Sequence, residues 1–117
     1  MTDNRAVLAQ AIDDWNNDNL SEYLKLYDAS VVLHGLPPGI DSVRTMYEGM
    51  WAAFPGSRLT LEDVVAEDDK VACRYTWRAT SADTAEMVAM PGVTILHFRE
   101  GRCVERWDFE GLEENVG

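Results

Sequence analysis

The spacing of hydrophobic and polar residues predicts helices in the first half of the chain and strands in the second half. Leu8, Ile12 and Trp15 lie four and three residues apart, which places them on one face of a helix. Thr2 is placed to cap the start of this helix, and the polar residues 16–19 end it. The same spacing predicts two further helices, whose apolar faces are Leu20, Tyr23, Leu24 and Tyr27 in the second and Val43, Met46, Tyr47, Met50, Trp51 and Phe54 in the third.

Strands are predicted around and after the third helix. Residues 30–35 ("SVVLHG") are typical of a short strand, and Asp41 or Ser42 can cap the helix that follows. From residue 59 onward, hydrophobic residues alternate with polar ones, as they do in strands that are buried on one face. The strands predicted from this alternation are 59–66, 70–80, 85–99 and 102–109.

Turn residues complete the predicted architecture. The Pro91-Gly92 pair predicts a bulge or an edge, "REG" at 99–101 predicts a hairpin turn, and residues 111–117 read as a loose tail. The order of elements predicts an α+β fold in one domain over residues 1–117. In this fold three N-terminal helices pack on a curved, mostly antiparallel sheet and leave a conical cavity.

Composition narrows the classes of ligand. The net charge of -11 argues against nucleic acid, because phosphate contacts need clustered Lys and Arg. An anionic ligand is also disfavoured, unless Arg74, Arg78 or Arg106 points inward. No apolar run approaches the roughly 20 residues that span a bilayer, and the acidic N-terminus does not resemble a signal peptide. We therefore expect a cytoplasmic protein that does not associate with membranes.

Cys73 and Cys103 are expected to be reduced cysteines of the core. They lie 30 residues apart, among alternating apolar residues, and no C-x-x-C motif or histidine cluster accompanies them. No metal site is predicted, because two histidines without further ligands at suitable spacing do not form one.

The alternation within residues 70–80 separates two faces of a strand. One face is broad and apolar, with a phenol and an indole as its polar groups; its members are Val71, Cys73, Tyr75, Trp77, Ala79 and Ser81. This pattern fits the wall of a pocket, but ordinary core packing demands the same pattern, so both interpretations remain open.

Three ionisable residues are candidates for acid–base chemistry. Alternation places Glu105 on one face with Cys103 and Trp107, where an ionised carboxylate would be costly to bury. Glu105 is therefore a candidate acid or base, or else the partner of an arginine on a neighbouring strand. His34 follows the short strand and is either a proton-transfer group or a donor to a loop carbonyl. His97 points into the cavity or into an interface between subunits.

Several sequence segments, in this order, resemble SnoaL-like proteins. These are polyketide-cyclase-type members of the nuclear transport factor 2-like superfamily. The segments are "VVLHGLPPG", "AAFPGSRLTLEDVVAEDDKVACRYTWRAT" and "VTILHFREGRCVERW", and they cover about two thirds of the chain. The resemblance implies a cone-shaped fold, a homodimer and a small hydrophobic ligand. It implies cyclisation, isomerisation or epoxide hydrolysis without a metal or organic cofactor.

The chain departs from the cyclase pattern at two places. Ser81 and Ala82 stand where the family often has His and Gly, and Glu110 or Gly111 stands where the cyclases have an acid–base Asp.

Two functional hypotheses follow. The first is a cofactor-free acid–base enzyme that uses Glu105, His34 and His97; the second is a non-catalytic ligand-binding or dimeric association module. Residues expected to surround the ligand are Trp15, Tyr47, Met50, Trp51, Tyr75, Trp77, Met87 and Trp107. A homodimer is predicted through the outer face of the sheet, because both faces of 85–99 carry apolar residues and the helices cover only one.

Overall fold

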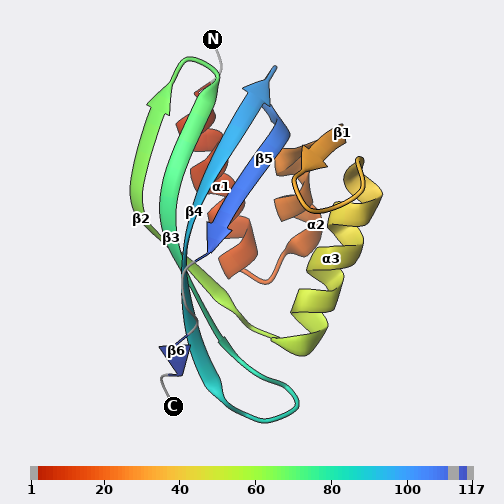
Figure 1. Cartoon of the computed structure of the whole chain (residues 1–117), viewed down its shortest axis with the longest axis vertical. Helices are drawn as coiled ribbons and strands as arrows, with labels where there is room; N and C mark the ends of the chain where they lie inside the picture. Colours follow the sequence, from red (N-terminus) through yellow and green to blue (C-terminus); the bar gives the residue numbers. More distant parts are fainter. Residues whose placement is uncertain (1–2, 111–113, 116–117) are drawn as a thin grey trace.

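A computed structural model describes residues 3–110 and 114–115 of the chain. Three helices and a turn of 3-10 helix lie on one side of a curved sheet (Figure 1). The helical elements are α1 (Asn4–Asn16), α2 (Leu20–Tyr23), the 3-10 helix η1 (Leu24–Leu26) and α3 (Ile40–Ala53). The strands are β1 (Tyr27–Leu33), β2 (Arg58–Glu67), β3 (Lys70–Thr80), β4 (Met87–Arg99), β5 (Arg102–Glu110) and β6 (Glu114–Asn115). The predicted α+β class and the packing of helices on a mostly antiparallel sheet are confirmed.

The sheet has the strand order β1-β5-β4-β3-β2. β1 pairs with β5 in parallel, and β2 to β5 form an antiparallel meander. β6 pairs with Val88 and Ala89 of β4, so the prediction of a loose tail is wrong for Glu114 and Asn115. The predicted hairpin turn between β4 and β5 is confirmed: Glu100 and Gly101 both have positive φ, as a tight two-residue hairpin loop requires.

Helix ends differ in detail from the predictions. The cap of α1 is Asp3, whose side chain accepts a hydrogen bond from the amide of Ala6; the predicted cap, Thr2, lies outside the described residues. α3 begins at Ile40 after Gly39, not after Asp41 or Ser42. Gly39 has φ 108°, a left-handed conformation that favours glycine and lets the chain turn sharply from the loop into the helix.

No bulge lies at Pro91-Gly92, where a bulge or an edge was expected. β3 and β4 pair in unbroken register, and Gly92 lies opposite Tyr75. The register shifts instead between Leu61 and Asp63 of β2, and on β5 opposite His97 and Phe98. Pro91 lies just beyond the last β4–β5 pair, so its missing amide hydrogen leaves that ladder intact.

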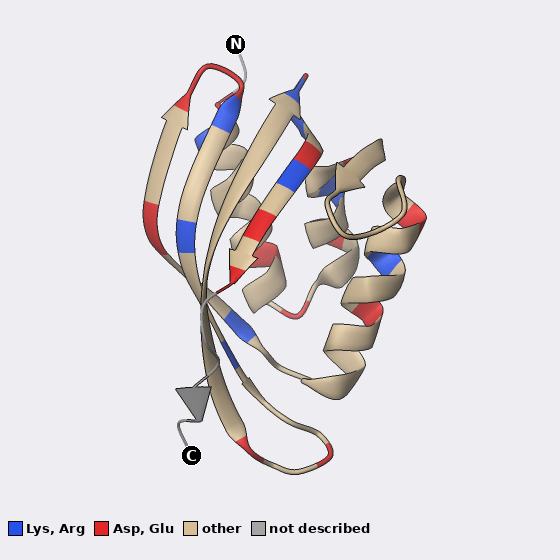
Figure 2. Cartoon of the chain, in the orientation of Figure 1, with Lys and Arg blue, Asp and Glu red and all other residues tan. Residues whose placement is uncertain are grey.

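The core fills the space between the helices and the sheet. Its fully buried side chains include Trp15, Val31, Val43, Val71 and Leu96. Basic and acidic residues are interspersed on β5 and α3, whereas β3 carries only basic ones (Figure 2). Within the described part of the chain, no helix is long and apolar enough to cross a membrane.

Candidate functional site: a cavity with one buried ion pair

A cavity of about 320 Å³ lies between the helices and the sheet. Most of its lining is apolar or aromatic, as is usual for sites that hold small molecules. The lining residues that the sequence had singled out as ligand contacts are Trp15, Tyr47, Met50, Tyr75 and Trp77. Its polar and charged side chains come from Tyr23, His34, Thr94, Arg106, Asp108 and Glu110, with Tyr47 and Tyr75.

The middle of β3 forms one wall of the cavity. All five inward residues of β3 belong to one buried cluster, but only Cys73, Tyr75 and Trp77 line the cavity, whereas Val71 and Ala79 do not. The middle of β3 therefore fits the interpretation as a pocket wall, and Val71 and Ala79 fit the interpretation as ordinary core.

Three of the expected ligand contacts lie elsewhere. Trp51, on α3, does not line the cavity, and its ring centroid lies 4.7 Å from that of Trp15. Met87, at the start of β4, is 47% exposed. Trp107 is stacked on the ring of His34, with ring centroids 5.0 Å apart.

The face assignment predicted for β5 is wrong beyond Cys103. Phe98 of β4 pairs with Cys103, but His97, the preceding residue, pairs with Glu105, so Val104 is an extra residue on β5. A bulge of this kind reverses the alternation of side chains after it. As a result Arg106 and Asp108 follow Cys103 onto the inner face, and Glu105 moves to the outer one.

Arg106 and Asp108 form an ion pair in the cavity wall. Nε of Arg106 lies 3.1 and 3.0 Å from the two carboxylate oxygens of Asp108, and Nη2 lies 2.9 Å from Oδ1. The two side chains are only 11% and 20% exposed. Neighbouring phenols and the Asp108 carboxylate outweigh the cost of burial and raise the pKa of Arg106, so the guanidinium stays charged.

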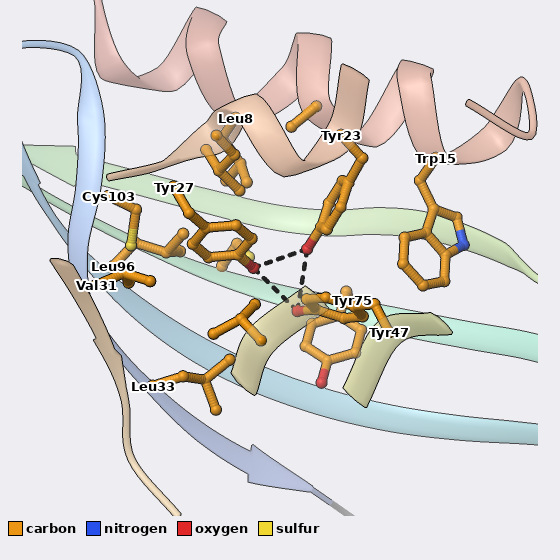
Figure 3. Close-up of a cluster of buried hydrophobic side chains, with 14 of the residues drawn as sticks. Leu8, Trp15, Tyr23, Tyr27, Val31, Leu33, Tyr47, Tyr75, Leu96 and Cys103 are labelled. Atoms are coloured by element: carbon orange, nitrogen blue, oxygen red, sulfur yellow. Dashed lines mark hydrogen bonds between the residues drawn. The ribbon is translucent and has the colours of Figure 1, made fainter. Parts of the chain in front are cut away.

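A cluster of three tyrosine hydroxyls lies against this arginine. We call Tyr23, Tyr27 and Tyr47 the tyrosine cluster; their hydroxyl oxygens lie 2.8, 2.9 and 3.1 Å apart (Figure 3). Nη1 of Arg106 donates to Tyr27 at 2.6 Å and to Tyr23 at 3.3 Å. Burial raises the pKa of Tyr27 and Tyr47 well above 10.0, so both remain protonated at neutral pH.

The predicted acid–base residues are paired at other places. Nε2 of His34 lies 2.7 Å from the Glu105 carboxylate, so the partner of Glu105 is a histidine and not an arginine. His34 also contributes to the cavity lining, whereas Glu105 does not. His97 lies on the outer face of β4 and contacts Asp69 at 2.7 Å, outside the cavity lining.

Sequence reasoning missed the tyrosine cluster and the pair of Arg106 with Asp108. Tyr23 and Tyr27 had been treated only as apolar positions of a helix face, and Tyr47 as such a position and as a ligand contact, although each carries a hydroxyl that needs a partner when buried. Arg106 had been named as one of three arginines that would matter if turned inward. Among the described residues, no group of three or more His, Cys, Asp or Glu side chains is placed to hold a metal ion.

Comparisons with known proteins agree with this architecture. Residues 8–106 match the SnoaL-like domain family. The fold is similar to that of AclR from Streptomyces galilaeus, a proposed hydroxylase, with a TM-score of 0.84 and 27% identity over 92% of this chain and 88% of that one. It is also similar to IdmH from Streptomyces antibioticus, a proposed polyketide cyclase, with a TM-score of 0.81 and 23% identity over 93% and 92% of the two chains.

A SnoaL-like polyketide cyclase from Agrobacterium tumefaciens has a TM-score of 0.84, with 19% identity over 95% of this chain and 93% of that one. No curated protein matches the chain.

Proposed function

Because the chain belongs to the SnoaL-like domain family, we propose that it binds a small, largely apolar molecule in its cavity and transfers protons to and from it without a cofactor. The observation that supports this most is the carboxylate of Asp108, held by Arg106 in the wall of a mostly apolar cavity. A carboxylate that lines the cavity is within reach of a bound molecule, as general acid–base catalysis requires. The reaction classes are those of cyclases, isomerases and epoxide hydrolases.

Asp108 and Glu110 are the proton-transfer groups of this proposal. They lie two residues apart on β5, and both line the cavity. Glu110 also stands at one of the two positions that the resemblance gives to the acid–base residue of the cyclases. One carboxylate removes a proton from a carbon next to a carbonyl group, or from an attacking water. The proton returns to the product, so the protein ends the cycle unchanged.

Aromatic residues position the substrate in this account. Trp15, Tyr47, Tyr75 and Trp77 line the cavity and offer flat, apolar surfaces to a ring system. Their burial excludes water from most of the wall, which strengthens the electrostatic effect of Arg106 on bound oxygen atoms.

The catalytic roles of Glu105, His34 and His97 stay predictions. His34 is the member of this group that lines the cavity, so it is the remaining candidate for a third proton-transfer group. Its contact with Glu105 supports a role in orienting the loop that follows β1.

Turnover by carboxylate variants tests the proposal. The purified protein is assayed with epoxides, ketosteroids and polyketide-like dicarbonyl compounds, alongside Asp108→Asn, Glu110→Gln and Glu105→Gln. We expect at least one of the two cavity variants to lose about 10²–10⁴-fold in kcat/KM, the usual contribution of an acid–base group. Glu105→Gln tests the role predicted for Glu105, and Glu67→Gln, which changes an exposed carboxylate at the end of β2, serves as the control and should change the rate little.

A non-catalytic ligand-binding module is the second candidate function. Ser81 and Ala82, which replace the His and Gly common in the family, favour it. If the protein binds some of the assayed epoxides, ketosteroids or dicarbonyl compounds but turns over none of them, this second candidate replaces the first.

We also propose that the protein forms a homodimer through the outer face of the sheet. Val93 is 41% and Phe109 59% exposed, and the two residues are cross-strand partners. Ile95 and Trp107, the adjacent pair, extend the same apolar surface. Exposed apolar surface of this kind usually marks an interface, and a twofold contact with a second copy would cover it on both subunits.

A further inference from the structure

Three charged side chains of the cavity follow one another along β5, in the order Arg106, Asp108 and Glu110. Arg106 and Asp108 neutralise each other, because the guanidinium contacts the carboxylate through Nε and Nη2. Arg106 and Glu110 are four residues apart, which is about 13 Å along an extended strand. Glu110 is therefore a separate negative charge that Arg106 does not offset.

The carboxylate of Glu110 has no basic partner within residues 3–110 and 114–115. None of the ion pairs in this part of the chain includes it. The other residues of the sequence contain no Lys, Arg or His. Glu110 is exposed and also lines the cavity, so it lies at the opening. A positively charged group of a bound molecule can supply the missing partner.

Tyr75 brings an aromatic ring to the same part of the cavity. Tyr75, Gly92 and Glu110 form one cross-strand row, because Gly92 pairs with Tyr75 on β3 and with Glu110 on β5. The far end of the Tyr75 ring lies over Gly92, so the side chain extends from β3 across β4. Burial, together with the negative charges of Asp108 and Glu110, raises the pKa of Tyr75 to about 12, as expected for a phenol near both carboxylates.

The aromatic rings of the cavity are all of the kinds that attract cations best. They are Trp15, Tyr23, Tyr47, Tyr75 and Trp77. The electron-rich faces of Trp and Tyr rings attract a cation placed over them. Among the described residues no lysine lines the cavity, and the ring of His34 is paired with the Glu105 carboxylate at 2.7 Å.

Long-range electrostatics favour cations at this opening as well. The chain has a net charge of -11, and a protein with an excess of one charge concentrates ions of the opposite sign around its clefts. An anion would meet the carboxylates of Asp108 and Glu110 instead. The inward-pointing Arg106 does not reverse this preference, because its charge is already paired with Asp108.

We propose that the cavity binds a molecule with one positively charged nitrogen, a protonated or quaternary amine, on an otherwise apolar body. The nitrogen lies at the opening, between the Glu110 carboxylate and the ring of Tyr75, and the apolar body lies deeper, against Trp15 and Trp77. This inference rests on the proposed function, because it takes the cavity as the ligand site. Proton transfer needs only one carboxylate, so Glu110 can hold the nitrogen while Asp108 remains for that role.

Benzylamine and benzyl alcohol test this assignment, because they have nearly the same shape and only the amine is charged at neutral pH. Dissociation constants are measured by titration calorimetry, with benzyltrimethylammonium as a second cation that has no N–H to donate. We expect both cations to bind about tenfold more tightly than the alcohol, the combined scale of a partly exposed ion pair and a cation–π contact. Added salt should reduce this preference, because it screens exposed charges.

Variants at Glu110 and Tyr75 separate the two contacts. Glu110→Gln should reduce the preference about fivefold, the upper end for an exposed ion pair. Glu67→Gln is the matched control, because it removes the same charge at an exposed position of β2 outside the cavity lining, and it should keep the preference. Tyr75→Leu should reduce the preference about threefold, the scale of a cation–π contact, whereas Tyr75→Phe retains the aromatic face and should keep it.

Three outcomes would overturn the assignment: binding of the alcohol as tight as that of the two cations, an equal effect of Glu67→Gln and Glu110→Gln, or no binding of benzylamine at millimolar concentration. Circular dichroism shows whether each variant is folded, and Glu110→Gln, at an exposed position, guards against the loss of Tyr75→Leu. Cation preference that depends on Glu110, without turnover of any assayed compound, would sustain this inference while the acid–base proposal failed. Turnover that depends on Asp108 or Glu110, without cation preference, would do the reverse.

Discussion

The ring of Tyr75 lies directly over Gly92, its partner on the neighbouring strand. A Cβ atom at Gly92 would come within 2.5 Å of both Cζ and the hydroxyl oxygen of Tyr75. The residue opposite Tyr75 therefore has to be a glycine if the phenol is to lie flat along the wall of the cavity. Gly92 thus leaves the space that the Tyr75 ring occupies in the wall of the cavity.

Gly92→Ala should narrow the cavity at modest cost to stability. The atoms in conflict are at the far end of the Tyr75 side chain, which can swing into the adjacent cavity. We expect a destabilisation of about 1 kcal/mol, at the low end for overpacking a core. Urea melts measure the stability, and binding of an aromatic ligand reports the narrowing. A loss of about 3 kcal/mol with ligand affinity unchanged would contradict this view of the wall.

Trp77→Ala should cost less than the removal of a fully packed aromatic residue. Trp77 is packed edge-on against Phe54 on one side, with ring centroids 4.9 Å apart, but it borders the cavity on another. Its removal enlarges a space that already exists, so the loss should fall below the usual ~3–5 kcal/mol. Phe98→Ala is the matched control, because Phe98 is 2% exposed in the packed core and should show the full loss.

Equal losses of free energy for the two variants would show that Trp77 is ordinary core. A smaller loss for Trp77→Ala, together with altered ligand selectivity, is the result expected of a wall residue.

Alternation of side chains predicted the inner face correctly on β3 but not on β5, although both strands pair with β4, and the reason is physical. β3 runs beside β4 in unbroken register, so simple alternation placed Cys73, Tyr75 and Trp77 on the inner face correctly. On β5 the extra residue Val104 reverses the alternation, and no local residue type marks it. The bulge depends on how β5 pairs with β4, which is a tertiary property, and Glu105 was assigned to the wrong face as a result.

The tyrosine cluster also depends on tertiary packing, so the local sequence does not predict it. Its members come from α2, β1 and α3, and their hydroxyls meet only when β1 and α3 pack against each other. The helical spacing at Tyr23 and Tyr47 correctly indicated burial, but it carried no information on the partner of each hydroxyl. Arg106, which points inward beside them, had been named only as one of three arginines that would have to point inward for the protein to bind an anionic ligand.

Stability should decline above about pH 9. Burial raises the pKa of Cys73 from 9.0 to about 11 and that of Cys103 to about 12. Below pH 9 the folded and unfolded chains both keep these protons, so stability is unaffected. At higher pH the unfolded chain releases them first, which lowers the free energy of unfolding until the folded thiols also ionise.

Urea melts between pH 7 and pH 11 measure this decline. Replacing Cys73 with alanine removes one of the two thiols, so the variant should show a shallower slope of stability against pH. An unchanged slope in Cys73→Ala would contradict the burial of this thiol.

Val93→Glu should dissociate the proposed homodimer. Val93 and Phe109 are cross-strand partners in the apolar surface that the second copy would cover. In a twofold contact the new carboxylate would lose its hydration and would lie against apolar groups or against the same carboxylate of the partner. Sedimentation at tens of micromolar should give a dimer for the wild-type protein and a monomer for this variant. Ala52→Glu, at an exposed position of α3, is the control and should remain dimeric. A monomeric wild-type protein would refute the interface.

The most direct test of the account is a crystal structure of the protein soaked with phenols, cyclic ketones and dicarbonyl fragments. The account predicts a fragment inside the cavity, with its ring between Tyr75 and Trp77 on one side and α3 on the other, close to the carboxylates of Asp108 and Glu110. Fragments bound only at the surface, with the cavity empty in every soak, would contradict the claim that this cavity is the functional site.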